Sequence, residues 1–329
     1  MRYVLGVDGG ATKTDYMVFS ADGDLVRHVR HGTISHEHFP EAFDKTRVLL
    51  REHIAEALDG LAEPKDVAAV FGLAGLDLPC QGEKLEKIIS DTGFMRFIAS
   101  NDGVLGIKAG TPNGHGICSI NGTATVAVGI DPKGTFRQVS GVAPFSGIEG
   151  GGTALAQKTA AAVYGELFRF GPHTAMTRLI LELFEVNDKH KYQETFLRRI
   201  QNDIKYLHVL TILLECAMEG DSVAVDILET AGREMAKSAA GCARELDFNG
   251  AAVNVVLAGS MWIKPKTPLM SDAFKREFNR CLNCEANYIS LEMPPAGGAV
   301  LWAMEVDSGV FPQGVLKDKV MSQVQQIKM

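Results

Sequence analysis

Residues 4–14 read VLGVDGGATKT, an apolar strand that runs into two glycines and then into alternating hydroxyl and lysine side chains. Because glycine has no Cβ atom, the backbone amides of Gly9 and Gly10 can approach an anion closely. Thr12 and Lys13 add a hydroxyl and an ammonium donor beside these amides. The stretch therefore predicts a phosphate-binding loop between two strands, and a plain glycine hairpin is the alternative.

A similar turn occurs in the second half of the chain. Residues 119–125 read SINGTAT and again place small residues and hydroxyls between two apolar strands. Asn121, Gly122 and Thr123 form this turn. Either loop alone is a weak signal, but two such loops at equivalent places in a repeated fold can hold a polyphosphate from both sides.

The order of the predicted elements also repeats. Each half begins with three consecutive strands and continues with alternating helices and strands. In the first half we expect strands at 2–7, 15–19, 24–30, 67–73 and 96–99 and helices at 41–61 and 83–90. In the second half we expect strands at 116–120, 125–130, 135–139, 252–258 and 288–291, with helices after 152, within 173–246, at 268–282 and after 298.

This repetition predicts a duplicated α/β fold with two domains, residues 1–112 and residues 113–329. The boundary falls in the segment 109–114, where glycine and proline interrupt the pattern. Such folds bind ligands in the crevice between the halves, at the carboxyl ends of the strands. Of the 34 glycines, 13 lie between Gly103 and Gly152, so we expect backbone to line this crevice.

Three carboxylates stand at the ends of predicted elements. Asp8 ends the first strand and is suited to hold Mg²⁺ through water. Asp102 follows the strand at 96–99 and can act as a general base or cap the helix that it precedes. Glu149 stands before a long helix, where it can bind sugar hydroxyls, join the outer shell of a metal ion or stabilise the helix N-terminus.

Composition excludes several classes of protein. The formal net charge is −7 and the isoelectric point is near 5.7, which argues against a nucleic-acid partner. No apolar run is long enough for a membrane span, and the first residues enter a strand pattern directly, so we expect no signal peptide. The six cysteines are scattered, with one weak C-x-x-C at Cys281 and Cys284, and predict a cytoplasmic protein. The histidines at 31, 36 and 38 are a weak candidate metal group.

Six collinear motifs carry a family resemblance. The chain resembles the N-acetylglucosamine kinase and BadF/BadG-type ATPase family, within the sugar-kinase, actin and heat-shock-chaperone superfold. The resemblance implies ribonuclease H-like domains of the actin/hexokinase type, ATP and Mg²⁺ as cofactors, and a homodimer. The motifs are VLGVDGGATKT (4–14), ASNDG (99–103), SINGTAT (119–125), GIEGGG (147–152), VVLAGSMW (255–262) and PPAGGAVLWA (294–303).

The resemblance also implies roles for individual residues. Phosphate contacts fall to Thr12, Lys13, Gly122 and Thr123, together with Gly9, Gly10 and Asn121 of the same loops. Gly259 and Ser260 border the adenosine, and Asp102 is the base. The expected substrate-binding residues are Ser35, His36, Asp77, Asn101 and Glu149.

Three positions depart from the pattern of the family. Ser35 stands where these kinases usually carry asparagine, Ile148 replaces an acidic residue, and Val142 replaces an aromatic one. These departures concern the sugar side of the site and leave the ATP loops intact. The exact sugar therefore stays open.

We expect an ATP-dependent kinase that phosphorylates an amino sugar, with N-acetylglucosamine or a related hexosamine first. One alternative is an ATPase that works through conformational change, like the activators of 2-hydroxyacyl-CoA dehydratases. Another is a sugar or nucleotide sensor without catalytic activity.

Overall fold

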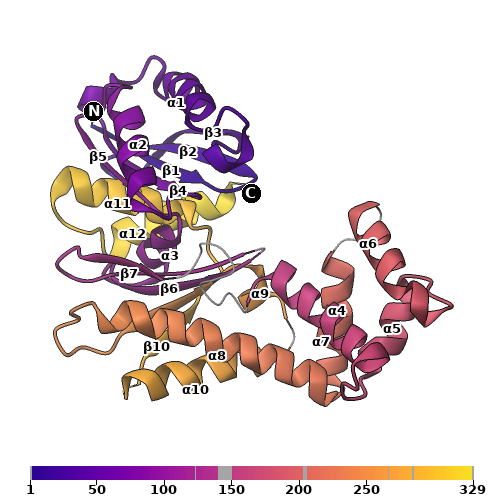
Figure 1. Ribbon diagram of the computed structural model, residues 1–329. Coiled ribbons are helices and arrows are strands. Elements are labelled where there is room, and N and C mark those ends of the chain that lie inside the picture. Colours follow the sequence, from indigo (N-terminus) through magenta and orange to yellow (C-terminus); the bar gives the residue numbers. More distant parts are fainter. Residues whose placement is uncertain are drawn as a thin grey trace.

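The chain forms two lobes and an arm of helices that projects from the second lobe (Figure 1). The computed structural model describes residues 2–122, 124–139, 150–202, 206–265, 267–283 and 285–327. Each lobe is built on one five-stranded sheet. The polar ends of these two sheets set the position of the candidate site.

The first sheet has the strand order β3-β2-β1-β4-β5. Its first three strands form an antiparallel meander, whereas β4 and β5 run parallel to β1. Helices α1 and α2 cover its outer face through a core that includes Leu5, Tyr16 and Leu50. The elements are β1 (Tyr3–Gly9), β2 (Lys13–Ser20), β3 (Leu25–Gly32), α1 (Phe43–Leu58), β4 (Ala68–Leu73), α2 (Pro79–Ser90) and β5 (Arg96–Ser100).

The second sheet repeats this topology with the order β10-β9-β6-β7-β8. Strands β6, β7 and β8 are the antiparallel meander, and β9 and β10 run parallel to β6. Helices α8 and α10 cover its outer face. The elements are β6 (Gly116–Asn121), β7 (Thr125–Ile130), β8 (Phe136–Val139), α8 (Ser222–Arg244), β9 (Asn254–Ala258), α10 (Leu269–Leu282) and β10 (Asn287–Ser290). The predicted duplicated α/β fold is confirmed.

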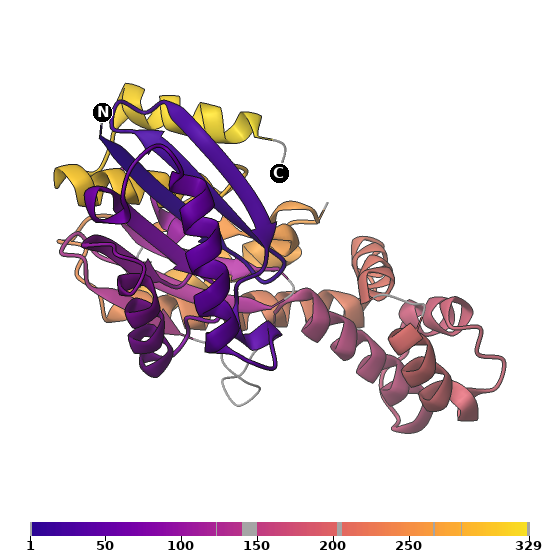
Figure 2. The same cartoon turned by 90° about the horizontal axis from the view of Figure 1, so that it is seen from above.

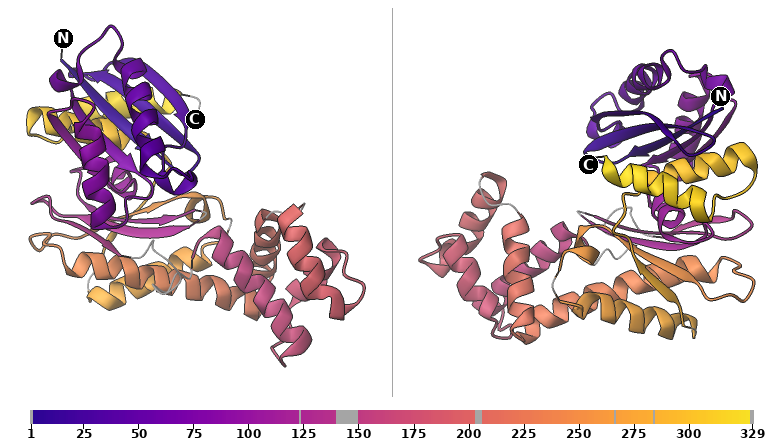
Figure 3. Two further views of the ribbon diagram at one scale, coloured as in Figure 1. Left: turned by 45° about the horizontal axis from the view of Figure 1, so that its top comes forward. Right: turned by 180° about the vertical axis from the view of Figure 1, so that it is seen from behind.

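One hydrophobic core fills the space between the two sheets. It joins side chains of both sheets to α3 (Gly103–Gly110), α11 (Ala296–Ser308) and α12 (Gly314–Gln326). In Figure 3 the two yellow helices lie between the indigo strands of the first sheet and the magenta strands of the second. The molecule is therefore layered as helices, sheet, helices, sheet, helices.

Two glycines allow α11 to enter this middle layer. A Cβ atom on Gly6 of β1 would lie 2.6 Å from the backbone nitrogen of Val300 in α11. A Cβ atom on Gly298 of α11 would overlap the carbonyl oxygen of Leu105 in α3. The helix thus packs backbone to backbone against both neighbours, which no larger residue permits.

Helix α12 fastens the end of the chain to the first sheet. The Gln323 side chain accepts a hydrogen bond from Leu25 N (2.9 Å) and donates one to Gly23 O (2.6 Å) at the β2–β3 turn. Seen from above, the yellow helices lie beside the indigo strands (Figure 2). The sequence predicted one closing helix, whereas the chain forms two. The division at 112/113 stays a prediction, but by packing α11 and α12 belong with the first sheet.

The projecting arm has a core of its own, built from side chains such as Leu155, Met176, Phe184 and Leu213. Its helices are α4 (Gly152–Phe168), α5 (Ala175–Leu183), α6 (Tyr192–Asn202) and α7 (Tyr206–Met218). The remaining short helices are η1 (His36–His38), η2 (Pro64–Asp66), η4 (Lys189–Lys191) and α9 (Ser260–Ile263). Among the described residues, no helix combines the length and the apolar composition needed to cross a membrane.

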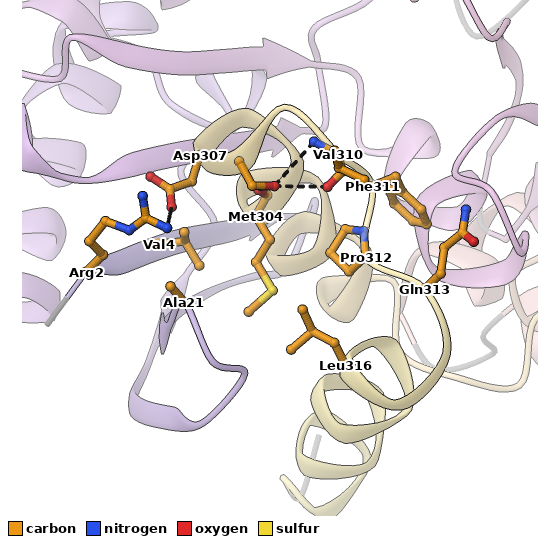
Figure 4. Close-up of a pocket in the computed structure, with 11 residues that line it drawn as sticks. Arg2, Val4, Ala21, Met304, Asp307, Val310, Phe311, Pro312, Gln313 and Leu316 are labelled. Atoms are coloured by element: carbon orange, nitrogen blue, oxygen red, sulfur yellow. Dashed lines mark hydrogen bonds and ion pairs between the residues drawn. The ribbon is translucent and has the colours of Figure 1, made fainter.

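A cavity of about 390 Å³ lies where β1 begins, against the α11–α12 turn (Figure 4). Val4 and Leu316 line it, and an ion pair between Arg2 and Asp307 (3.5 Å) closes one side. Val4 lies about 13 Å along the strand from Asp8, at roughly 3.3 Å per residue. The cavity is therefore at the opposite end of β1 from the predicted phosphate loop.

Replacing Gly298 with alanine should destabilise the protein by at least about 1–3 kcal/mol, the usual effect of overpacking a rigid interior. The added methyl group would overlap the carbonyl oxygen of Leu105. The matched control is Gly165→Ala in α4, where a Cβ atom meets no heavy atom within 4 Å and alanine gains about 0.5–1 kcal/mol. Circular dichroism melting should show a lower midpoint for the first variant only. Equal midpoints would mean that the contact between α11 and α3 relaxes freely.

Candidate active site

The first predicted loop joins β1 to β2. A hydrogen bond from Gly10 N to Lys13 O (2.9 Å) closes it as a tight hairpin. Ala11 and Thr12 at its tip are exposed. Lys13 is 42% exposed, and its Nζ lies 3.1 Å from a carboxylate oxygen of Asp15. The loop has the donors that a phosphate needs, although its backbone is also that of an ordinary hairpin.

The second loop joins β6 to β7 and is tied to the start of α4. Gly122 N donates to Ala124 O (3.0 Å), and Gly152 N donates to Gly122 O (2.8 Å). A Cβ atom on Gly122 would meet nothing within 4 Å, so open space adjoins the loop. Thr123 lies outside the described residues. The Gly-rich entry to α4 and the loop therefore form one unit.

Asn121 holds this unit together from inside. Its side chain is fully buried, and its Oδ1 accepts a hydrogen bond from Gly151 N (2.9 Å). Its Nδ2 points to the sulfur of Met270 at 3.5 Å. We predicted a nucleotide contact for Asn121, but these bonds commit its side chain to the protein. Its described role is to fix the loop.

The predicted adenosine segment lies beside the same loop. Gly259 has φ +100°, and a Cβ atom there would lie 2.5 Å from the carbonyl oxygen of Asn121. Ser260 begins α9 and is exposed. The indole of Trp262 donates to Ser119 O (3.0 Å) and ties α9 to β6. Only glycine can adopt this backbone without strain at such close range.

Asp102 opens α3 directly after β5. Its carboxylate makes no capping hydrogen bond; instead Asn101 Oδ1 accepts from Gly103 N (2.9 Å). Burial and then the charge of Asp77 raise the pKa of Asp102 to about 6, whereas contacts of its carboxylate with the backbone amides of Gly103 and of Asp102 itself oppose the rise. The cap that we considered for Asp102 is thus made by Asn101. The Asp102 carboxylate is therefore not the cap of α3.

Asp8 lies close to Asp102. Burial, and then the negative charges of Asp102 and Asp15, raise the pKa of Asp8 to about 7, whereas Lys13 opposes the rise. The carboxyl ends of β1 and β5 therefore bring two carboxylates into one electrostatic field. Shifts of this kind are frequent at catalytic sites.

The predicted substrate residues gather next to Asp102. Asn101 Nδ2 donates to Asp77 Oδ1 (3.0 Å), and burial raises the pKa of Asp77. A Cβ atom on Gly75 would lie 3.0 Å from Ser35 Oγ and 3.2 Å from the ring of His36. Ser35 Oγ is buried without a hydrogen-bond partner among the described residues. Glu149, Val142 and Ile148 lie outside the described residues.

His36 is fixed in this group by its neighbours. Its ring stacks on Phe43 at 4.0 Å between centroids, and its Nε2 lies 3.4 Å from the side-chain amide of Gln81. Burial lowers the pKa of His36, against the nearby charges of Glu37 and Asp77. The ring is therefore held as a neutral group.

Gln138 is a residue that the sequence reasoning missed. It lies on β8 of the second sheet, and its Nε2 donates to Asp77 Oδ1 at 2.6 Å. It reaches the first lobe at the place where the substrate residues gather. A glutamine in an edge strand carries no sequence signal of such a contact.

The weak metal candidates are dispersed in the fold. His31 stacks on His53 at 3.8 Å and pairs with Glu56 (3.0 Å), away from His36. Cys281 lies near the end of α10, and Cys284 is outside the described residues. Among the described residues, no three His, Cys, Asp or Glu side chains are grouped to hold a metal ion. Any ion near Asp8 would therefore need water or phosphate oxygens as further ligands.

Comparison with known proteins identifies a family and a relative of this chain. The profile of the BadF/BadG/BcrA/BcrD ATPase family matches residues 5–303. The N-acetylmuramic acid/N-acetylglucosamine kinase of Clostridium acetobutylicum is 26% identical over 308 residues, which cover 92% of this chain and 98% of the relative.

Two solved structures share the fold. A protein of Chromobacterium violaceum, provisionally named an N-acetylglucosamine kinase, has a TM-score of 0.63 and 21% identity, covering 92% of this chain and 99% of its own. A protein of Porphyromonas gingivalis with the same provisional name has a TM-score of 0.58 and 13% identity, covering 93% and 100%. At these identities the likeness concerns the fold.

Asp8→Asn should raise the melting midpoint at pH 8 by a few degrees and leave it unchanged at pH 4. The folded pKa of about 7 exceeds the ordinary value of 3.8, so the folded chain binds more protons and stability falls as pH rises through this window. Asparagine removes that penalty. Asp22→Asn on an exposed turn is the control, with no change expected at either pH. An equal gain at both pH values would attribute the effect to packing.

Proposed function

The chain belongs to the BadF/BadG/BcrA/BcrD ATPase family, and on that premise we propose that it is a kinase that transfers phosphate from ATP to an amino sugar. The expectation that the chain uses ATP follows from its membership of this ATPase family. The proposal that the acceptor binds at this place rests on the Asp102 carboxylate. This carboxylate makes no capping hydrogen bond to α3 and has a pKa of about 6, and Asp77 and Asn101 lie beside it. N-acetylglucosamine and N-acetylmuramic acid are the first candidates, because the relative from Clostridium acetobutylicum is named for both.

Asp102 acts as the general base in this proposal. The acceptor hydroxyl oxygen bonds to the γ-phosphorus, the bond from that phosphorus to the β,γ-bridging oxygen breaks, and the hydroxyl proton passes to Asp102. A pKa of about 6 keeps the carboxylate mostly ionised near neutral pH while leaving it able to accept the proton. ADP and the sugar phosphate are the products.

The two hairpin loops bind the nucleotide. Gly9, Gly10, Thr12 and Lys13 contact phosphates from the first lobe, with Gly122 and Thr123 opposite and Gly259 and Ser260 beside the adenosine. Asp8 fits a divalent cation, because burial and the charges of Asp102 and Asp15 destabilise its anion. Asp8 would hold Mg²⁺ through water, and the ion would neutralise phosphate charge.

The acceptor contacts Asp77, His36, Ser35 and Glu149. The acceptor contact of Asn101 stays a prediction, and its amide is also engaged with Asp77 and with the start of α3. It therefore orients its neighbours. A homodimer, a cytoplasmic location and the absence of a nucleic-acid partner stay predictions from the sequence.

Asp102→Asn should lower sugar-dependent kcat by about 10²–10⁴-fold, the usual contribution of a positioned base. A coupled assay of ADP release over a panel of amino sugars and hexoses measures this. Isothermal titration should give an ATP dissociation constant within about twofold of the parent, because the substitution removes a transition-state interaction. Asp22→Asn provides the control for an unrelated loss of charge.

The same assay decides between the functional classes. A kcat within a few-fold of the parent would place the base elsewhere. ATP turnover that needs no sugar would favour an ATPase driven by conformational change. Binding of sugar and ATP without turnover would favour a sensor.

Gln138→Ala should raise the acceptor KM by about tenfold, the effect of losing a hydrogen bond to a charged group, and leave the ATP KM unchanged. The reason is its bond to Asp77 across the lobes (2.6 Å). The matched control is Arg137→Ala, whose side chain pairs with Glu245 (3.0 Å) on the far face of β8. Equal effects of the two variants would mean that the edge strand as a whole, and not the Asp77 contact, matters.

A further inference from the structure

Asp15 is a buried charge to which the proposed reaction gives no role. It lies on β2, two residues after Lys13, and its side chain is 1% exposed. A buried carboxylate is unfavourable unless cations and hydrogen bonds compensate it. Its partners therefore indicate what it does.

The two oxygens of Asp15 have separate partners. Oδ1 accepts from His28 Nε2 and Arg30 Nε, both at 2.7 Å, and both donors come from β3. Oδ2 faces Lys13 Nζ at 3.1 Å. Burial raises the pKa of Asp15, but the hydrogen bonds from Arg30 and His28 and the charge of Lys13 outweigh it and lower the pKa overall. One oxygen is thus anchored on the sheet and the other is directed at Lys13.

The strand register places this group at the phosphate loop. Asp15 is paired with Asp8 on β1 and with Arg30 on β3. Residues two apart on a strand share a face, so Lys13 and Asp15 lie on the same side of β2. Asp8 and Asp15 therefore lie side by side on one face of the sheet, and Lys13 lies next to Asp15 at the loop end of β2.

Lys13 needs such an anchor to act at a defined point. Its side chain is 42% exposed and samples many rotamers when it is free. A carboxylate held by two strands confines the ammonium group without taking up all of its three donors. Donors of the ammonium group therefore remain available for phosphate oxygens, since its contact with Oδ2 is an ion pair without hydrogen-bond geometry.

We propose that Asp15 is a positioning residue that holds the Lys13 ammonium in place for the phosphates of the nucleotide. The proposal rests on the proposed function, since it assumes that Lys13 contacts phosphate. Asp15 itself touches neither nucleotide nor acceptor. His28 and Arg30 serve it by fixing its other oxygen.

A double-mutant cycle tests the proposal. The variants are Asp15→Asn, Lys13→Met and the pair together, and the measurements are the ATP dissociation constant by titration calorimetry and the KM values for ATP and sugar. Each single variant should weaken ATP binding about tenfold, as for loss of one charge-assisted hydrogen bond. The pair should bind ATP no more weakly than Lys13→Met alone, because Asp15 then has nothing left to position. The sugar KM should stay unchanged in all three.

Asp24→Asn is the matched control, because it removes a carboxylate that pairs with a lysine, Lys319 (2.7 Å), at the β2–β3 turn, which is the opposite end of β2 from Lys13. It should bind ATP like the parent, whatever its melting midpoint. If Asp15→Asn does not fold, Asp15→Glu replaces it, since moving the carboxylate by one methylene should weaken ATP binding while keeping the charge. If Asp15→Glu binds ATP as tightly as the parent protein, the proposal is overturned.

The outcomes distinguish a failure of the positioning role of Asp15 from a failure of the phosphate contact of Lys13. Additive losses in the double variant would overturn the positioning role of Asp15 and leave the phosphate contact of Lys13 standing. Unchanged ATP binding in Lys13→Met would instead remove the phosphate contact itself. If Asp15→Asn raises the KM for sugar more than the KM for ATP, the proposal is also contradicted.

Discussion

The close contact of α11 with β1 and α3 is the constraint on which the rest of the structure depends. Gly6 and Gly298 let three backbones meet where any side chain would collide. That contact sets the distance between the two sheets, and the core between them includes residues from both lobes. Because the sheets are held this way, polar side chains from distant parts of the chain, such as Asp77 and Gln138, meet between the lobes.

Charge at the candidate site is held at a cost to stability. Asp8 and Asp102 are half-buried within the same electrostatic field, and the pKa of each is raised. A chain selected for stability alone would place neutral residues there. Carboxylates whose negative charge is destabilised in this way are useful in a phosphoryl-transfer site, because a cation, a proton or a hydroxyl donor can stabilise them there. Asp15 shows the opposite arrangement, a buried carboxylate stabilised by Lys13, Arg30 and a hydrogen bond from His28.

Much of the site's organisation depends on side chains that bind protein groups. Asn121 and Asn101 both stand in loops that the sequence marks as chemical, yet each uses its amide to hold a neighbouring backbone nitrogen. Asn101 thereby takes over the helix cap and leaves Asp102 available. Gln138 adds a bond from the other lobe, 61 residues away from Asp77. Such contacts turn loops of ordinary composition into a fixed arrangement.

The sequence by itself determined the duplicated fold, most strand and helix positions and the two hairpin loops, because periodicity, glycine placement and turn residues are local properties of the chain. It also singled out Asp102. Only the tertiary structure decided that α12 returns to the first sheet, that Asn101 bonds to the first backbone nitrogen of α3, and that Gln138 contacts Asp77 and Asp15 contacts Lys13. These depend on which side chains meet between the lobes and across three strands. Their partners are set by packing distance, which local sequence does not encode.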